Sequence, residues 1–174
     1  KKSDAPPEER LEPLEELARL SPEDYEVRTE WGATLRGLER DDEAREVFWD
    51  LGRDAFGNKS YDAALRAFKR LLELSPFDIE AHQRIARIHA QERREQAAFA
   101  KYRDLLRMAY HAGLDQLATE AGRHALEIDP DHVEVPTVLA GVYERLGDTA
   151  RAAQEYLREA QLEHSANPRP WQML

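Results

Sequence analysis

The sequence predicts an all-α fold, a helical-repeat solenoid of about eight stacked antiparallel helices, and three observations support this. Similar segments recur along the chain at a fixed spacing, with starts at positions 20, 74 and 128. Apolar residues follow helical spacing, as Leu65, Phe68, Leu71 and Leu72 do at i, i+3, i+6 and i+7. No segment keeps the alternation of apolar and polar residues that a half-buried strand requires.

The recurring segments each combine the end of one helix, a Ser or Asp that can cap, a proline, and the start of the next helix. They begin at Leu20, Leu74 and Ile128, so the step is 54 in both cases (74 − 20 and 128 − 74). The same step relates Ala44, Ala98 and Ala152; Phe48, Tyr102 and Tyr156; Leu51 and Leu105; Phe56 and Tyr110; Leu72 and Leu126. Small residues thus recur with an aromatic residue one turn later on the same helical face, which indicates an internal repeat.

The predicted helices follow from these signals in chain order. A helix at about 8–20 opens the chain, ahead of the repeats. Two repeats of three helices and a shorter third follow, at about 25–39, 42–57 and 60–74, then 79–92, 95–112 and 114–128, then 133–146 and 149–163. The breaks between helices carry turn-forming residues: Gly57, Asn58 and Ser60, then Gly113, then Gly147 and Asp148.

We expect these helices to form one repeat domain at 8–164. Its units and tails are expected at about 25–78, 79–132 and 133–163, with a disordered or extended segment at 1–7 and a C-terminal tail at 165–174. In that tail Trp171, Met173 and Leu174 would cover the end of the stack or pack on a further repeat. Because the chain also lacks an initiator Met, we expect a fragment of a longer protein or a processed form.

The charge of the chain is unevenly distributed. The net charge is −10, which argues against a general nucleic-acid binder. Residues 1–50 sum to −8, residues 51–112 to +4 and residues 113–174 to −6. A basic middle between acidic ends indicates either a ligand with an acidic segment or an ordinary solvated surface.

Composition also limits the class of protein. With no cysteine, disulfides, thiolate catalysis and cysteine-based zinc sites are excluded. The apolar runs are too short for membrane insertion, and the first residues do not form a signal peptide, so a cytoplasmic location is the default expectation. Arginine outnumbers lysine by 20 to 5 (25 in total), which fits a bacterial source with a GC-rich genome.

The sequence shows no convincing catalytic or cofactor motif. It has no Gly-rich phosphate loop, no Gly-x-Ser-x-Gly elbow and no His-Glu-x-x-His. His82 and His89 are seven apart and are expected to be partly buried structural residues more often than metal ligands. Ser21 and Ser75 precede prolines and are expected to cap helices. We therefore predict a protein that is not an enzyme, with no metal and no cofactor.

Residues 45–78 resemble a tetratricopeptide repeat, a 34-residue helix–turn–helix unit. The matching residues are Phe48, Leu51, Gly52, Ala64, Phe68 and Pro76, with Ala55 where Tyr is usual. Residues 133–162 match through Leu139, Ala140, Tyr143, Gly147, Asp148, Ala152 and Tyr156, and residues 79–108 more weakly through Ile85, Ala86, Ala98 and Tyr102. The prolines Pro76 and Pro130 are 54 apart, or 34 plus 20, so helices 42–57 and 95–112 are each expected to serve in two overlapping pairs.

The resemblance implies a groove lined by the first helix of each pair, and binding of a protein or peptide there. Arg53, Arg84 and Arg87 fall on groove-facing positions, and Arg103 and Arg107 do so if 95–112 acts as a first helix. Guanidinium groups suit carboxylates of a bound acidic segment, although the same arginines could pair with local acids such as Asp50 and Asp104. The family's Lys/Asn carboxylate clamp is not carried over, because Trp49 and Arg53 occupy its positions.

These inferences predict a non-catalytic scaffold that binds a partner peptide or domain in its concave groove. Two alternatives stay open. The apolar ends or the acidic N-terminal helices could build a homo-oligomer, or the chain could be the docking or regulatory arm of a larger enzyme.

Overall fold

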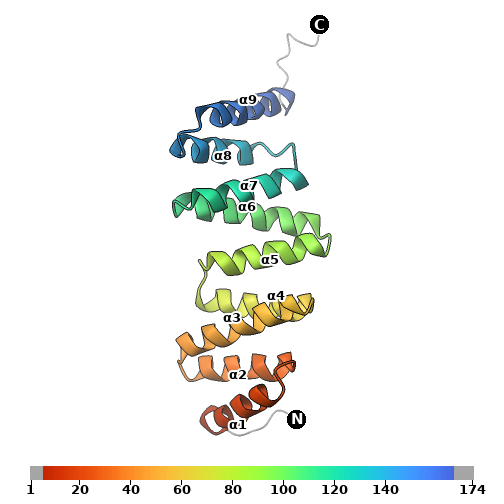
Figure 1. Ribbon diagram of the computed structural model, residues 1–174, viewed down its shortest axis with the longest axis vertical. Helices are drawn as coiled ribbons and strands as arrows, with labels where there is room; N and C mark the ends of the chain where they lie inside the picture. Colours follow the sequence, from red (N-terminus) through yellow and green to blue (C-terminus); the bar gives the residue numbers. More distant parts are fainter. Residues whose placement is uncertain (1–5, 167–174) are drawn as a thin grey trace. The chain divides into compact units, whose positions relative to one another are not determined.

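The structure, a computed structural model, describes residues 6–166, and these form nine α-helices and no strand (Figure 1). The all-α repeat predicted from the sequence is confirmed. The number of helices is nine, when the opening helix α1 is counted with the eight helices of the repeats. The helices are α1 (Pro7–Leu20), α2 (Tyr25–Gly37), α3 (Asp41–Gly57), α4 (Tyr61–Leu74), α5 (Ile79–Gln91), α6 (Glu95–His111), α7 (Asp115–Ile128), α8 (Glu134–Arg145) and α9 (Thr149–Ala166). Trp171, Met173 and Leu174 lie outside the described residues.

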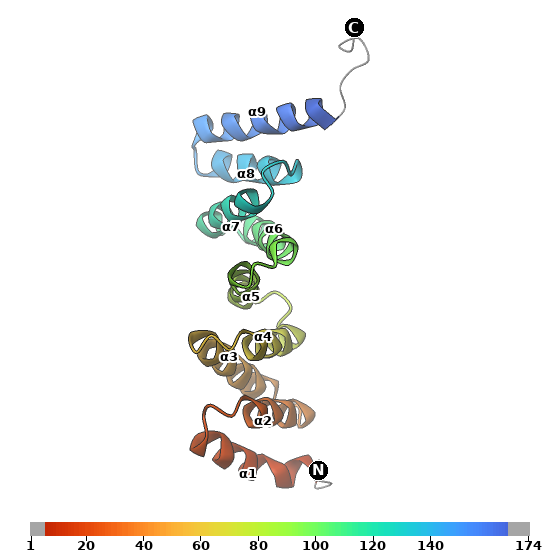
Figure 2. The same ribbon diagram turned by 90° about the vertical axis from the view of Figure 1, so that its right-hand side faces the viewer.

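Contacts divide the chain into two compact units, Lys1–Ile88 and His89–Leu174. Within each unit, helices that follow one another in the chain pack together: α1 to α4 in the first, and α6 to α9 in the second. Figure 2 shows α1 beside α2 and α8 beside α9 from a second direction. The predicted domain at 8–164, with units at 25–78, 79–132 and 133–163, is not tested by this division and stays a prediction.

The helix boundaries follow the same step as the sequence repeat. Helices α1, α4 and α7 begin at Pro7, Tyr61 and Asp115, which are 54 apart (61 − 7 and 115 − 61), and their ends keep this step. Helices α2 and α5 match at both ends, as do α3 and α6, and α9 begins one step after α6. Helix α1 is therefore the counterpart of α4 and α7, where a counterpart means the position one 54-residue repeat away. Counted from α1, the described chain holds three three-helix repeats.

The turns repeat in the same way as the helices. Glu39, Arg93 and Gly147 are counterparts and have φ of 59°, 56° and 74°. Lys59 and Gly113 are also counterparts and have φ of 59° and 72°. Left-handed backbone favours glycine, yet three of these five positions carry long side chains. The repeat imposes this backbone on whichever residue is present. Residue type therefore predicts the left-handed turns at the glycines and not those at Glu39, Lys59 and Arg93.

The helix caps differ from the expectation for Ser21 and Ser75. Both serines lie at the C-terminal ends of α1 and α4, and neither caps the following helix. Asp24 instead accepts hydrogen bonds from the backbone N–H groups of Glu26 and Val27 at 3.1 and 3.0 Å. Its counterpart Asp78 accepts one from Ala81 at 2.9 Å. The proline after each serine lies in a turn and not in the following helix. The side chain that caps that helix is therefore the aspartate three positions after the serine.

Close helix packing in the first unit depends on pairs of a glycine and a phenylalanine on neighbouring helices. Gly32 on α2 faces Phe48 on α3, and Gly52 on α3 faces Phe68 on α4. A Cβ atom on either glycine would lie 2.7 or 2.6 Å from the nearest ring carbon. Both phenylalanines are fully buried. Helix α3 therefore provides the ring for one pair and the glycine for the next, as the overlapping pairs predict.

In the second unit the close pair of a glycine and a large residue lies between different helices. The counterparts of Gly52 and Phe68 are Leu106 and Gly122, so the large residue moves from the later helix to the earlier one. Leu106 is fully buried, and a Cβ atom on Gly122 would lie 2.5 Å from Leu139 on α8. The glycine and the large residue in contact therefore lie on α7 and α8, one helix further along the repeat than Gly52 and Phe68.

The close packing of α3 on α4 predicts opposite effects for two glycines of one helix. Gly52→Ala places a methyl group against the buried Phe68 ring, so we expect a loss of about 1–3 kcal/mol in the free energy of unfolding. Gly57→Ala meets no atom within 4 Å, so this control should be neutral or stabilising by up to about 1 kcal/mol. Denaturant unfolding of both variants measures the difference, and equal effects would contradict the packing assignment.

Candidate functional site

The arginines predicted to bind a partner lie in both units. Arg53 lies on α3, and Arg84 and Arg87 lie on α5, all within the first unit. Arg103 and Arg107 lie on α6 in the second unit. The structure places the first three on two helices of one unit. A single groove containing all five stays a proposal.

In the first unit Arg84 is held by an aromatic ring. Its guanidinium carbon lies 5.5 Å from the centre of the Phe56 ring on α3, and its Nη2 lies 3.4 Å from Glu80. Arg53 precedes Phe56 by three positions, so both lie on the same side of α3. Arg53 is exposed and pairs with Asp50 at 3.0 Å, one of the local acids named above. Phe56 therefore brings Arg84 of α5 against α3, the helix that also carries Arg53.

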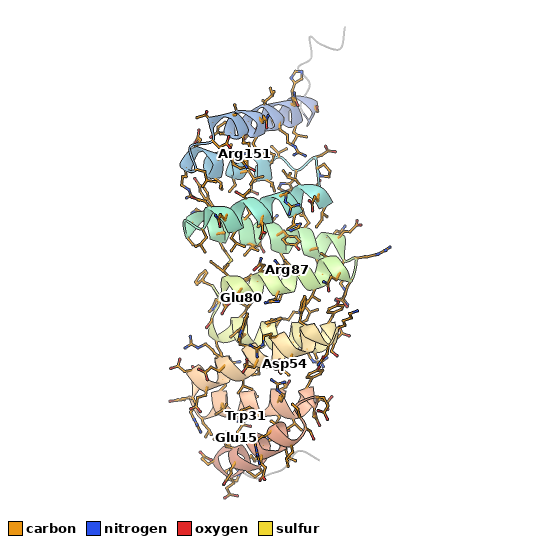
Figure 3. The ribbon with its side chains drawn as sticks, viewed as in Figure 1. Glu15, Trp31, Asp54, Glu80, Arg87 and Arg151 are labelled. Carbon is orange, nitrogen blue, oxygen red and sulfur yellow. The ribbon has the colours of Figure 1, made fainter. Side chains whose placement is uncertain are left out.

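Arg87 differs from the other arginines of this group. It lies one turn after Arg84 on α5, at an exposed position, and it has no ion pair among residues 6–166. Figure 3 labels its side chain. An unpaired guanidinium keeps its full capacity for two parallel hydrogen bonds to a carboxylate. To bind a ligand carboxylate, Arg53 and Arg84 would first have to break their ion pairs with Asp50 and Glu80, each worth at most about 1 kcal/mol. Arg87 is therefore the best-placed residue of the three to bind an acidic ligand.

In the second unit the two arginines of α6 already have partners. Arg103 is half-buried, and its Nη2 lies 3.3 Å from Asp104. Arg107 is exposed and lies 3.3 Å from Glu134 of α8. Their pairing with nearby acids does not test whether they bind a partner, so that role stays a proposal.

Sequence reasoning missed the arginine at position 66. Arg66 on α4 is exposed and, unlike its neighbour Arg70, has no ion pair among the described residues. It lines a surface cavity of about 580 Å³ with Arg10 of α1 and the small residues Ala33 and Gly37 of α2. No sequence signal marks it, because the cavity forms only when three non-identical helices meet.

His82 and Trp49 have packing roles. The Nε2 atom of His82 lies 2.9 Å from the carbonyl oxygen of Pro76, and the ring is half-buried. Its counterpart Arg28 donates a hydrogen bond to the carbonyl of Pro22 at 3.1 Å. Both side chains therefore stabilise equivalent turns. Trp49 is half-buried with its ring centre 5.7 Å from that of Phe68. No group of three potential metal ligands occurs among residues 6–166.

Glu155 on α9 is a half-buried carboxylate in the second unit. Its Oε2 atom is buried and accepts no hydrogen bond within the described chain. Burial raises the pKa of Glu155, and the nearby charge of Arg158 only partly offsets this effect. Burial therefore penalises the charged form of Glu155, which destabilises the folded state wherever the carboxyl is ionised.

No protein-family model and no curated protein matches the sequence. Among solved structures, a crystal structure of MamA protein is similar at 16% identity over 87% of this chain and 89% of that chain, with a TM-score of 0.38. MamA 41-end from Desulfovibrio magneticus RS-1 is 21% identical over 91% of this chain and 86% of that chain, with a TM-score of 0.29. A putative kinesin light chain with nearly identical TPR-like repeats from Podosopora anserina is 15% identical over 94% and 90%, with a TM-score of 0.49.

Likeness at these values carries no argument about function. The helix bounds and the packing of α3 on its neighbours show an all-α helical repeat. Within residues 6–166 no helix is long and apolar enough to cross a membrane.

The raised pKa of Glu155 predicts a pH-dependent stability difference. Because folding favours the protonated carboxyl, the native state loses stability as pH rises through the folded-state pKa. Glu155→Gln removes this loss, so its melting temperature should exceed that of the wild type at neutral pH and approach it in acid. Glu163→Gln, at an exposed position of the same helix, is the control and should show no such trend. A Glu155→Gln gain that persists unchanged in acid would exclude the explanation.

Proposed function

We propose that this chain is a non-catalytic protein-interaction scaffold that binds an acidic segment of a partner peptide or domain. The contact is centred on Arg53, Arg84 and Arg87 of the first unit. Arg103 and Arg107 of the second unit are proposed as a separate part of the binding surface. The observation that carries the proposal is the exposed, unpaired Arg87 beside an arginine stacked on Phe56. Such a pair offers both fixed geometry and free charge to a carboxylate.

The electrostatics support an acidic partner. The middle of the chain, residues 51–112, has a net charge of +4 within a protein whose total is −10. A local excess of positive charge attracts an acidic segment, while the acidic remainder disfavours nonspecific binding to polyanions. Because these arginines lie at the surface, binding should weaken as ionic strength rises.

Charge reversal at Arg87 tests this function. The probe is a panel of fluorescein-labelled peptides in which the number of Asp and Glu residues rises while the apolar residues stay fixed. Arg87→Glu should weaken binding of the acidic peptides by about tenfold or more, because it replaces an attraction with a repulsion. Arg19→Glu, at an exposed arginine of α1, makes the same change in net charge and should leave affinity unaltered.

Fluorescence anisotropy at two salt concentrations gives the dissociation constants. If Arg87→Glu binds the acidic peptides as well as the wild type does, or if no peptide of the panel binds, the proposed function is wrong.

A further inference from the structure

Helix α1 exposes apolar side chains at positions that are buried in the other repeats. Leu17 and Leu20 are 50% and 66% exposed, and Pro13 is also exposed. These three residues lie on one side of the helix, because each is about one turn from the next, and we call this side the α1 face. The counterparts of Pro13 and Leu17 are all buried; they are Ala67 and Leu71 on α4, and Ala121 and Ala125 on α7. The repeat therefore covers this side of α4 and α7, while residues 6–166 leave it uncovered on α1.

In the other two repeats the cover is the helix that comes before in the chain. Helix α4 packs on α3 and α7 packs on α6, whereas α1 packs on α2, the helix that follows it (Figure 2). The rings of Tyr102 on α6 and His124 on α7 are stacked with their centres 4.9 Å apart, so position 124 faces the preceding helix. The counterpart of His124 on α1 is Glu16, which lies one turn before Leu20 of the α1 face. The α1 face is therefore the surface on which a preceding helix would pack.

Helices α3 and α6 each place an aromatic ring from their last turn against a second helix. The ring centre of Phe56 on α3 lies 5.5 Å from the guanidinium carbon of Arg84 on α5. Its counterpart Tyr110 on α6 lies in the same way at 4.1 Å from Arg145 on α8. The counterpart of both rings is Lys2, so the first repeat has no aromatic residue at this position of the sequence.

Beside α2, a surface cavity lies where this ring would be. The cavity has a volume of about 580 Å³, and Ala33 and Gly37 of α2 line it. Their counterparts on α8 are Gly141 and Arg145, the two residues against which Tyr110 packs. A Cβ atom on Gly37 would meet nothing within 4 Å, so the space over this part of α2 is open. The first repeat therefore keeps both the α1 face and the ring position of a helix that residues 6–166 do not supply.

The charged residues that line the cavity balance one another. Arg10 of α1 forms an ion pair with Glu30 of α2. The exposed Glu26 and Arg66 also line the cavity and are of opposite sign. The cavity thus favours neither an acidic nor a basic ligand, and an uncharged aromatic ring suits it.

The edge of the α1 face is acidic instead. Glu9, Glu12 and Glu16 are exposed along it, and Glu9 and Glu12 have no ion pair among residues 6–166. Arg19 lies nearby, with its guanidinium 4.0 Å from the Glu16 carboxylate. Helix α1 as a whole carries two basic and five acidic residues, a net charge of −3.

Helices that pack in this way elsewhere in the chain have opposite net charges. Helix α3 carries two basic and six acidic residues, and α4 carries three and two, so their net charges are −4 and +1. Helix α6 carries three basic and two acidic residues, and α7 carries one and three, so their net charges are +1 and −2. At the positions of Glu12 and Glu16, α4 has Arg66 and Arg70. An acidic α1 is therefore complementary to a basic helix.

We propose that the α1 face and the cavity beside α2 together bind an amphipathic helix of a partner protein. The apolar side of the partner helix covers Pro13, Leu17 and Leu20, as α3 covers α4. An aromatic residue in its last turn enters the cavity, and basic residues along one edge pair with the carboxylates of α1.

A second copy of this chain does not meet these requirements. Its helix α9 is the counterpart of α3 and α6, but His164 occupies the position of Phe56 and Tyr110. Helix α9 carries two basic and three acidic residues, so its net charge of −1 has the same sign as that of α1. The partner is therefore a different protein.

Two peptides from the chain's own repeats test the site. Peptide 93–112 contains α6 with Tyr110, and its five basic and two acidic residues give a net charge of +3. Peptide 39–58 contains α3 with Phe56, and its three basic and seven acidic residues give −4. Peptide 93–112, labelled with fluorescein, should bind the wild type with a dissociation constant in the micromolar to millimolar range, because a short helix must fold as it binds.

A charge exchange on α1 should reverse the preference between the peptides. The double variant Glu12→Arg and Glu16→Arg introduces the residues that α4 has at these positions, so it should keep the helicity and melting temperature of the wild type. It should bind peptide 93–112 at least about tenfold more weakly and peptide 39–58 more tightly than the wild type does. Binding of the acidic peptide to the arginine site is common to both proteins, so the difference between them reports on α1.

An apolar substitution tests the α1 face itself. Leu17→Glu should weaken the binding of peptide 93–112 by about tenfold or more, because it removes the centre of the apolar contact. Leu157→Glu makes the same change at an exposed leucine of α9 and should leave the affinity unaltered. Sedimentation velocity of the peptide-free wild type should show no association that Leu17→Glu removes.

Three results would each overturn the proposal. Peptide 93–112 fails to bind the wild type, or binds the double variant equally well. Leu17→Glu binds it as tightly as Leu157→Glu does. The peptide-free wild type associates through Leu17, which would assign the α1 face to a second copy of the chain.

Discussion

Within each unit of this chain, a helix buries its apolar face against the helix that precedes or follows it in sequence. Phe48 lies against Gly32 of the helix before it, and Phe68 against Gly52 in the same way. Such nearest-neighbour packing means that no helix has a core of its own, and that a large side chain on one helix requires a small one on the next. The 54-residue register, the turns and the exposed surfaces all depend on this constraint.

The constraint explains which features the sequence could predict. Ala44, Ala98 and Ala152 are all buried, and the aromatic residues one turn later follow the same face, so spacing alone identified the helices and their pairing. The overlapping use of α3 was also predictable, because Gly52 and Phe48 each fit a different position of the repeat motif. Helix ends were displaced by at most three positions, most at the C-terminal end of α9, while α2 and α5 begin where the sequence predicted after their proline turns.

Other features of the fold and of the candidate site could be recognised only in the three-dimensional structure. The sequence matched only the ends of α1, α4 and α7, at Leu20, Leu74 and Ile128. Their equivalence over the whole helix was not predicted, since the counterparts of Phe68 are Leu14 and Gly122 and share no residue type. The left-handed turns at Glu39 and Arg93 escaped because their residues do not favour that backbone. Among candidate binding residues, sequence position selected Arg87 and its group, but it could not show that Arg87 is unpaired while Arg103 and Arg107 are engaged.

The repeat also serves as an internal reference for function. Positions that keep one residue type across the repeats, such as the buried alanines, are explained by packing. Positions that change from polar to apolar without a change in backbone, such as Phe77, are not required for folding. Binding of an acidic segment is proposed at exposed arginines, of which Arg87 is the one without an ion pair among residues 6–166.

The most direct test of this account is a deletion of residues 25–78, which joins Asp24 to Ile79. The account predicts a shorter protein that unfolds cooperatively, because α5 is the counterpart of α2 and can pack on α1 in its place. Deletion of positions 45–78, the segment that resembles a single tetratricopeptide unit, should instead disrupt folding, since α5 would then follow α2 in the position of α3. Thermal unfolding monitored by circular dichroism distinguishes the two. A 25–78 deletion that fails to fold, or a 45–78 deletion that is equally well tolerated, would contradict the three-helix repeat.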